Sequence, residues 1–259
     1  MKILSKASVG ILTVFLLTAT AFAQQASNPP GDVVPHTFPD NINDYWRPNN
    51  ESRSFRREDR VIKKGLLAPS AQDRLTYESF LQERKTGLIR LMPRESYDWE
   101  TYHAKKRVPI RGGGAYYSFA NLTHAYGYGN DLALERNFLS VGFTVGDYGM
   151  LTNIGNRSLE DVTLNDPATR FISQYAAPRP ERAARSEYRR FQSGVTIDGA
   201  LYRSRLPLEI GATYLLRSIV YRESDVLVAF RTVRKDPDGS VIIAWKLLKS
   251  YPAPELSRK

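Results

Sequence analysis

Three residue types that hydrolases use for catalysis lie close together in one segment of the chain. Ser118, His124 and Asp131 fall within a short stretch, and they are the types that serve as nucleophile, general base and orienting acid. A triad needs these side chains within hydrogen-bond reach, so the close spacing requires a sharp turn, which Gly127 and Gly129 permit. Ser118 lacks the G-x-S-x-G elbow that exposes a nucleophile. A metal-independent hydrolase that acts on glycans or esters is therefore only the alternative hypothesis for the function.

The segment that carries them, residues 111–131, reads RGGGAYYSFANLTHAYGYGND. A phosphate-binding loop needs a set glycine spacing and a following helix. Neither GxGxxG nor GxxxxGK[ST] occurs, and the residues after the glycines favour a strand. The glycines therefore predict a flexible entry into a strand over residues 115–122.

The aromatic residues of this segment are its candidate ligand-binding groups. Tyr116 on the strand, and Tyr126 and Tyr128 next to glycines, could present rings for a ligand, as could the cation of Arg111. Exposed rings next to small residues suit sugar faces or peptides. The alternative is that the tyrosines pack at the edge of a β core.

The composition excludes several kinds of site. The chain has no cysteine, which excludes disulfides, thiolate catalysis and iron–sulfur clusters. Its three histidines are far apart and form no H-x-H or H-E-x-x-H pair. The run from Asp236 to Gly239 resembles a fragment of a calcium loop, but a turn between two strands explains it. We therefore expect neither a metal nor a cofactor.

A basic helix is a candidate polyanion-binding surface. In ERAARSEYRRFQ, Arg182, Arg185 and Arg189 share one helical face, which could contact an anionic surface. The alternative is an ordinary surface helix, because Glu181 and Glu187 oppose part of the charge.

The N-terminus predicts export. Residues 1–23 combine lysines, a short apolar run and the small-x-small pattern Ala21-Phe22-Ala23, which together indicate a cleaved secretory signal peptide rather than a membrane anchor. Its removal leaves no transmembrane anchor and takes the net charge from +10 to +8 through the loss of two lysines. The lack of cysteine favours a bacterial exported protein, in the periplasm or outside the cell.

The remaining chain predicts one folded domain with an antiparallel core. Residues 24–64 are rich in proline and asparagine and predict an extended or disordered lead-in. Residues 65–259 predict a single α+β domain with about three peripheral helices. Short gaps between the apolar runs of residues 212–251 require an antiparallel meander. We expect this sheet to form a sandwich or a partly closed barrel, because its strands are apolar at nearly every position.

These features favour a non-catalytic binding or envelope-associated module. The expected partner is a cell-envelope glycan or an anionic surface. Nucleic acid is not expected, because the basic residues 53–60 are nearly balanced by acids.

Overall fold

The computed structural model describes residues 67–97, 113–124 and 128–257. All of them belong to one compact unit, residues 47–259. The predicted signal peptide and lead-in lie outside the described residues. No helix in the described part of the chain is both long and apolar enough to cross a membrane.

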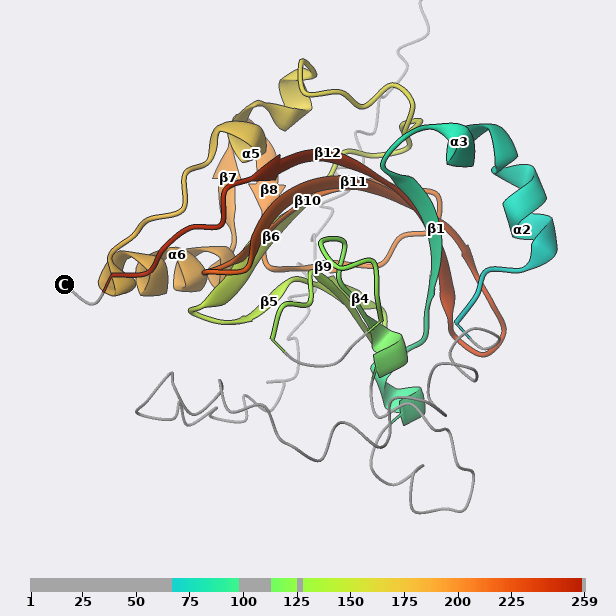
Figure 1. Cartoon of the computed structure of the whole chain (residues 1–259), viewed down its shortest axis with the longest axis horizontal. Coiled ribbons are helices and arrows are strands. Elements are labelled where there is room, and N and C mark those ends of the chain that lie inside the picture. Colours follow the sequence, from blue (N-terminus) through green and yellow to red (C-terminus); the bar gives the residue numbers. More distant parts are fainter. Residues whose placement is uncertain (1–66, 98–112, 125–127, 258–259) are drawn as a thin grey trace, which may run out of the picture. The chain divides into compact units, whose positions relative to one another are not determined.

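The predicted C-terminal meander is confirmed and forms the centre of the fold. Strands β10 (Thr213–Val220), β11 (Ser224–Lys235) and β12 (Val241–Tyr251) are antiparallel neighbours, joined by short turns. Strand β1 (Thr86–Leu91) extends the sheet beside β12, and β6 (Asp147–Asn153) and β5 (Gly142–Thr144) extend it beside β10. The resulting six-stranded sheet curls strongly, as Figure 1 shows. The α+β class with a mostly antiparallel core is therefore correct.

A smaller sheet lies against the inner face of this curl. It has four antiparallel strands in the order β2-β3-β4-β9: Tyr116–Tyr117, Leu132–Glu135, Phe138–Ser140 and Arg205–Pro207. The space between the sheets is filled by buried side chains from both, among them Leu134, Leu216 and Trp245. The inward-pointing apolar residues of the large sheet therefore belong to a core between the two sheets. A second core lies on the outer face of the large sheet.

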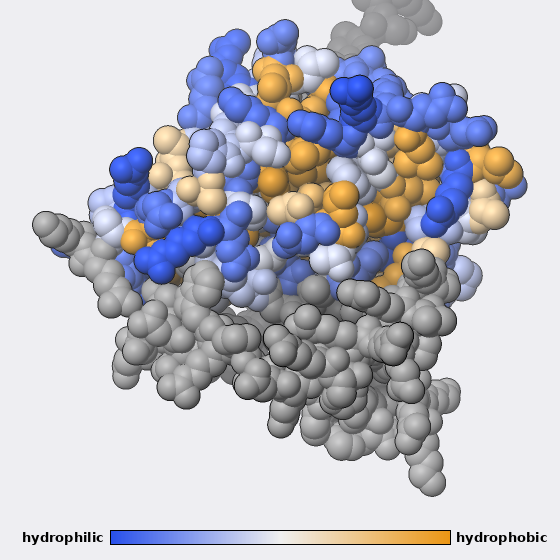
Figure 2. All heavy atoms as spheres, viewed as in Figure 1, coloured by the Kyte–Doolittle hydropathy of each residue, from blue (hydrophilic) through white to orange (hydrophobic). Residues whose placement is uncertain are grey.

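Short helices cover the outer face of the large sheet. They are α2 (Ala71–Thr76), α3 (Glu78–Gln82), α5 (Arg170–Gln174) and α6 (Glu181–Ser193), with the hairpin of β7 (Val195–Ile197) and β8 (Ala200–Tyr202) beside α6. Phe80, Ile172 and Phe191 pack from these helices onto Leu215 and Leu227 of the sheet. Because apolar groups cover both faces, the meander strands are apolar at almost every position. Figure 2 shows hydrophobic side chains at the middle of one face of the molecule, with hydrophilic ones around them.

Local sequence signals set several helix ends. Ser70 and Asp73 form a capping box at the start of α2. Asp166 accepts a hydrogen bond from the backbone N–H of Ala168, and Pro167 follows it in the first turn. Helix α6 ends at Gly194, whose φ of 90° suits a residue without a side chain.

Two segments form shorter strands than their sequences suggest. The strand over residues 115–122 is confined to β2, and it follows a 3₁₀ turn over Gly113–Ala115. The apolar run over residues 132–144 is divided into three strands, because Arg136 adopts a positive φ of 55° between β3 and β4 and Gly142 one of 75° at the start of β5. An apolar run does not reveal where the backbone reverses.

A buried arginine ties helix α5 to the large sheet. Arg217 of β10 is 1% exposed, and its Nη2 lies 2.9 Å from Asp225 Oδ2 of β11. Its guanidinium also donates to the carbonyl oxygens of Ile172 and Tyr175, at the end of α5, and lies 3.2 Å from the centre of the Tyr251 ring. The last carbonyls of a helix have no partner within the helix. Arg217 therefore supplies hydrogen-bond donors to the unpaired carbonyl groups at the end of α5 and balances the charge of Asp225.

Substitution of Gly149 tests whether β6 lies too close to β10 to leave room for a side chain at this position. A Cβ at this position would lie 2.3 Å from the Arg217 carbonyl oxygen and 2.5 Å from Val141 Cγ2. We expect Gly149→Ala to lower the free energy of unfolding by about 1–3 kcal/mol, measured by urea denaturation. Gly146→Ala is the control, because its Cβ would meet the Tyr128 hydroxyl at an ordinary 3.4 Å. Equal effects of the two substitutions would contradict the close approach.

Candidate functional site

Ser118 and Asp131 meet, but as parts of a buried turn. Ser118 Oγ donates to Asp131 Oδ2 at 3.2 Å, and the backbone N–H groups of Phe119 and Ala120 donate to the same oxygen at 2.6 and 3.2 Å. The backbone N–H of Asn121 donates to Ser118 Oγ. In a catalytic triad the base lies between nucleophile and acid. Here the acid contacts the serine directly and fixes the turn over residues 118–121.

His124 makes a different contact. Its Nε2 lies 2.9 Å from the carbonyl oxygen of Arg90, and its ring packs edge-on against Tyr117. This geometry does not place Nε2 between Ser118 and Asp131. The hydrolase alternative therefore receives no support from these three residues.

The tyrosines of the same segment are less accessible than the sequence suggested. Tyr116 is 1% exposed and packs on Phe143, so the expectation of an accessible Tyr116 ring is wrong. The cause is that both faces of β2 are covered. Tyr128 is partly buried, and its hydroxyl donates to the carbonyl oxygens of Gly146 and Tyr221. Arg111 and Tyr126 lie outside the described residues, and the ligand-binding role of this group stays a prediction.

Two buried carboxyl groups lie close enough for one to affect the pKa of the other. Asp131 is 0% exposed and Asp147 is 1% exposed, and one oxygen of each has no hydrogen-bond partner. Burial raises the pKa of both, and the pKa of Asp147 rises further through repulsion from Asp131 and Glu223. Ser218, Ser118 and the backbone N–H groups of Phe119 and Ala120 favour the charged form of Asp131, whereas the N–H of Gly129 favours that of Asp147. Asp147 therefore retains its proton to higher pH than Asp131.

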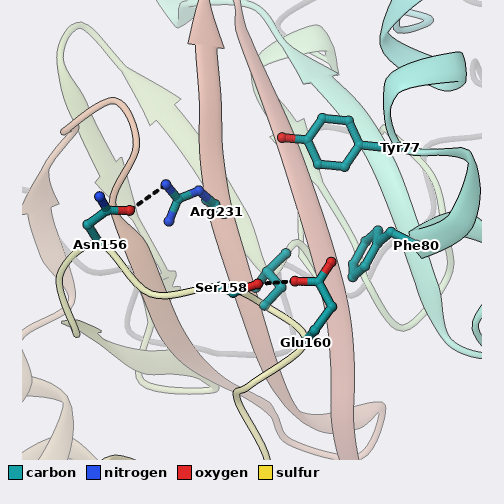
Figure 3. A pocket seen from close by; sticks show the side chains of 7 residues that line it. Tyr77, Phe80, Asn156, Ser158, Glu160 and Arg231 are labelled. Carbon is teal, nitrogen blue, oxygen red and sulfur yellow. Dashed lines mark hydrogen bonds between the residues drawn. The ribbon is translucent and has the colours of Figure 1, made fainter.

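A solvent-accessible pocket lies elsewhere, on the outer face of the large sheet. It has a volume of about 330 Å³ and is lined by side chains of α2–α3, of the loop after β6 and of β11: Tyr77, Phe80, Asn156, Ser158, Leu159, Glu160 and Arg231. Figure 3 shows Tyr77 and Phe80 on one side, Asn156 and Arg231 opposite, and the Glu160 carboxylate between Ser158 and Phe80. Segments from three parts of the sequence thus meet in one small cavity of mixed polarity.

The apolar wall of the pocket is aromatic. Tyr77 and Phe80 pack edge to face, with ring centres 6.4 Å apart. Phe80 is buried and fixes this wall to the core, whereas Tyr77 remains half-buried. Burial raises the pKa of Tyr77, so its hydroxyl remains protonated and can donate a hydrogen bond at neutral pH.

The polar wall is held in place by two cations of the sheet. Arg231 donates to the Arg157 carbonyl oxygen and to Asn156 Oδ1, at 2.8 and 2.6 Å. Lys246 Nζ donates to the carbonyl oxygens of Leu159 and Glu160. These bonds fix the loop over residues 156–160 to β11 and β12. The loop is therefore preorganised rather than free to collapse into the pocket.

Glu160 is the acidic group of this pocket. The Ser158 hydroxyl donates to its carboxylate, which lowers the pKa of Glu160, and the positive charges of Lys246 and Arg231 lower it further. Glu160 is therefore ionised at neutral pH and accepts hydrogen bonds. No other carboxylate lines the pocket within the described residues.

The sequence contains little that could identify this pocket. Tyr77 and Phe80 follow a rough helical spacing, which does not reveal that Phe80 is buried while Tyr77 stays partly accessible. Glu160 is followed by Asp161, and such acidic pairs are usually solvated surface groups. The wall contributed by Arg231 depends on which face of β11 is outward, and that follows only from the strand register.

The basic helix is confirmed, with one correction to its free charges. Ala184, Tyr188 and Phe191 are buried and form the apolar side of the helix. Arg185 is not a free cation, because it forms an ion pair with Glu181 four residues earlier. Arg182 and Arg189 are exposed and have no ion-pair partner among the residues that the structure describes.

The described residues show no cluster of metal ligands: across 67–97, 113–124 and 128–257, no three His, Asp or Glu side chains are grouped so that they could hold an ion.

Comparison of the chain with protein-family models, with curated proteins and with solved structures finds no match.

Proposed function

We propose that this is an exported, non-catalytic binding protein that holds a cell-envelope glycan in the pocket formed by Tyr77, Phe80 and residues 156–160. The observation that carries the proposal is the pairing of an aromatic wall with fixed hydrogen-bonding groups. The C–H face of a sugar packs on aromatic rings, while its hydroxyls need acceptors and donors at set positions. Glu160, Ser158 and the Tyr77 hydroxyl supply these groups at one site.

The same site favours binding over glycan hydrolysis. Most glycosidases use two carboxyl groups, about 5–10 Å apart, on either side of the scissile bond. Glu160 is the single carboxylate among the described lining residues. Its lowered pKa makes it a poor general acid, because that role needs a carboxyl group that keeps its proton near neutral pH.

Glycan binding should depend on Glu160 and Tyr77. We expect wild-type protein to bind a soluble fragment of cell-wall glycan, or tetra-N-acetylchitotetraose, in a calorimetric titration. Glu160→Gln should weaken binding about tenfold, because a hydrogen bond to a charged group is worth about 1.5–3 kcal/mol. Tyr77→Ala should weaken it at least as much by removing the ring. Glu83→Gln is the matched control, because Glu83 is exposed and does not line the pocket.

The outcomes separate the two candidate functions. Unchanged affinity in both pocket variants, or no binding of either glycan by wild-type protein, would contradict the proposal. Release of new reducing ends from the glycan, abolished by Ser118→Ala, would instead support the hydrolase alternative.

A further inference from the structure

A second surface of the protein, on the side of α6 that faces solvent, has the chemistry of a membrane contact. Because Ala184, Tyr188 and Phe191 are buried, the opposite face of α6 points away from the core. Arg182 and Arg189 are seven residues apart on that face, which places them about 10 Å from each other along the helix. Figure 2 shows hydrophilic side chains gathered over the part of the molecule where Figure 1 places α6.

The surface continues past the end of the helix onto the edge of β8. Arg203 Nε donates to the carbonyl oxygen of Gln192, in the last turn of α6, and the Arg203 side chain is exposed. Leu201 lies beside it, since a Cβ on Gly194 would be 3.4 Å from both Leu201 Cδ1 and Arg203 Cδ. Leu201 is 46% exposed, so an apolar side chain lies at the surface next to Arg203.

The charge of this surface is not cancelled locally. Glu181 and Glu187 form ion pairs with Arg185 and Arg190, so they are already occupied. Arg179, just before the helix, is also exposed. Asp198, at the turn of the β7–β8 hairpin, is an opposing acid. An excess of arginine therefore remains.

We propose that this surface, formed by Arg182, Arg189, Leu201 and Arg203, binds the phosphate headgroups of an anionic lipid membrane. Guanidinium groups contact phosphate oxygens in pairs and with defined geometry. An exposed leucine among them suits the boundary between headgroups and acyl chains, where basic and apolar side chains are found together. A purely anionic polymer would offer no apolar group for Leu201 to contact. Membrane contact would hold the protein at the envelope, and it is independent of the glycan pocket.

Vesicle binding tests this surface. Wild-type protein should sediment with vesicles of 30 mol% phosphatidylglycerol in phosphatidylcholine, but not with vesicles of phosphatidylcholine alone, and salt should release it. Arg182→Gln/Arg189→Gln should lower the partition coefficient about 25-fold, since each cation near an anionic surface contributes about fivefold. Arg74→Gln/Arg84→Gln makes the same charge change at two exposed arginines, one on α2 and one in the turn after α3, and should lower it less than threefold.

The leucine distinguishes lipid from other polyanions. Leu201→Ser should reduce vesicle binding and leave retention on a heparin column unchanged. Equal losses in the two arginine pairs would overturn the proposal, because overall charge would then explain the binding. Retention on heparin without any vesicle binding would overturn it in favour of an anionic polymer. Glycan titration of the same variants should be unchanged, so failure here would leave the proposed pocket function standing.

Discussion

Replacing Arg217 by alanine is expected to lower the free energy of unfolding by about 3–5 kcal/mol, measured by urea denaturation at neutral pH. The substitution leaves Asp225 buried without its partner and removes the guanidinium that donates to the last carbonyl groups of α5. It also opens a cavity beneath Tyr251, whose ring contacts the guanidinium. An effect of this size is a large part of the stability of a typical domain, about 5–15 kcal/mol.

Two further variants show whether the buried charge is the cause. Arg217→Met/Asp225→Leu removes both charges together and should cost clearly less than Arg217→Ala, because no buried group is left unpaired. Arg222→Ala breaks an exposed ion pair with Glu255 and should cost less than about 1 kcal/mol. A loss below 1 kcal/mol for Arg217→Ala would show that the guanidinium does not secure α5.

The second large effect is a dependence of stability on pH that arises from Asp131 and Asp147. Both carboxyl groups have a raised pKa in the folded protein, so the folded state binds protons more tightly than the unfolded chain. Their contribution is complete below the unfolded pKa of about 3.9. It is lost as pH rises toward the folded pKa, by up to about 1.4 kcal/mol per pH unit for each group.

Asp147→Asn should flatten this dependence. The amide resembles the protonated acid in shape but cannot ionise, so the variant should become progressively more stable than wild type as pH rises above the unfolded pKa of about 3.9. Asp73→Asn is the control of opposite sign, because Arg234 lowers the pKa of Asp73 to about 2. That pair stabilises the fold above the unfolded pKa and is lost as pH falls. The free energy of unfolding is measured by urea denaturation from pH 5 to 9. If it changes with pH equally in wild type and in Asp147→Asn, the raised pKa of Asp147 is contradicted.

The sequence predicts the parts of this fold that depend on local rules. The meander over residues 212–251 follows from strand composition and short turns, and the ends of α2 and α6 follow from capping residues. Which strands pair in the smaller sheet could not be predicted, since β2 joins β3 and β9 joins β4 across long stretches of chain. Such pairing depends on tertiary packing rather than on local propensity.

The candidate site was harder to predict for the same reason. Ser118, His124 and Asp131 are close in sequence, yet hydrogen bonds to backbone groups determine their positions. The pocket instead collects Tyr77, Glu160 and Arg231 from distant segments. Residue types near one another in sequence indicate chemistry only when the backbone also brings the side chains together, and here the strand register decides which do.

Mapping the glycan by nuclear magnetic resonance tests the central claim most directly. Wild-type protein is titrated with tetra-N-acetylchitotetraose or a soluble cell-wall glycan fragment while the backbone amide signals are followed. The proposed function predicts that the largest shifts fall on residues 77–80, on residues 156–160 and around Arg231. Shifts confined to residues 116–131, or no shifts at millimolar glycan, would contradict it.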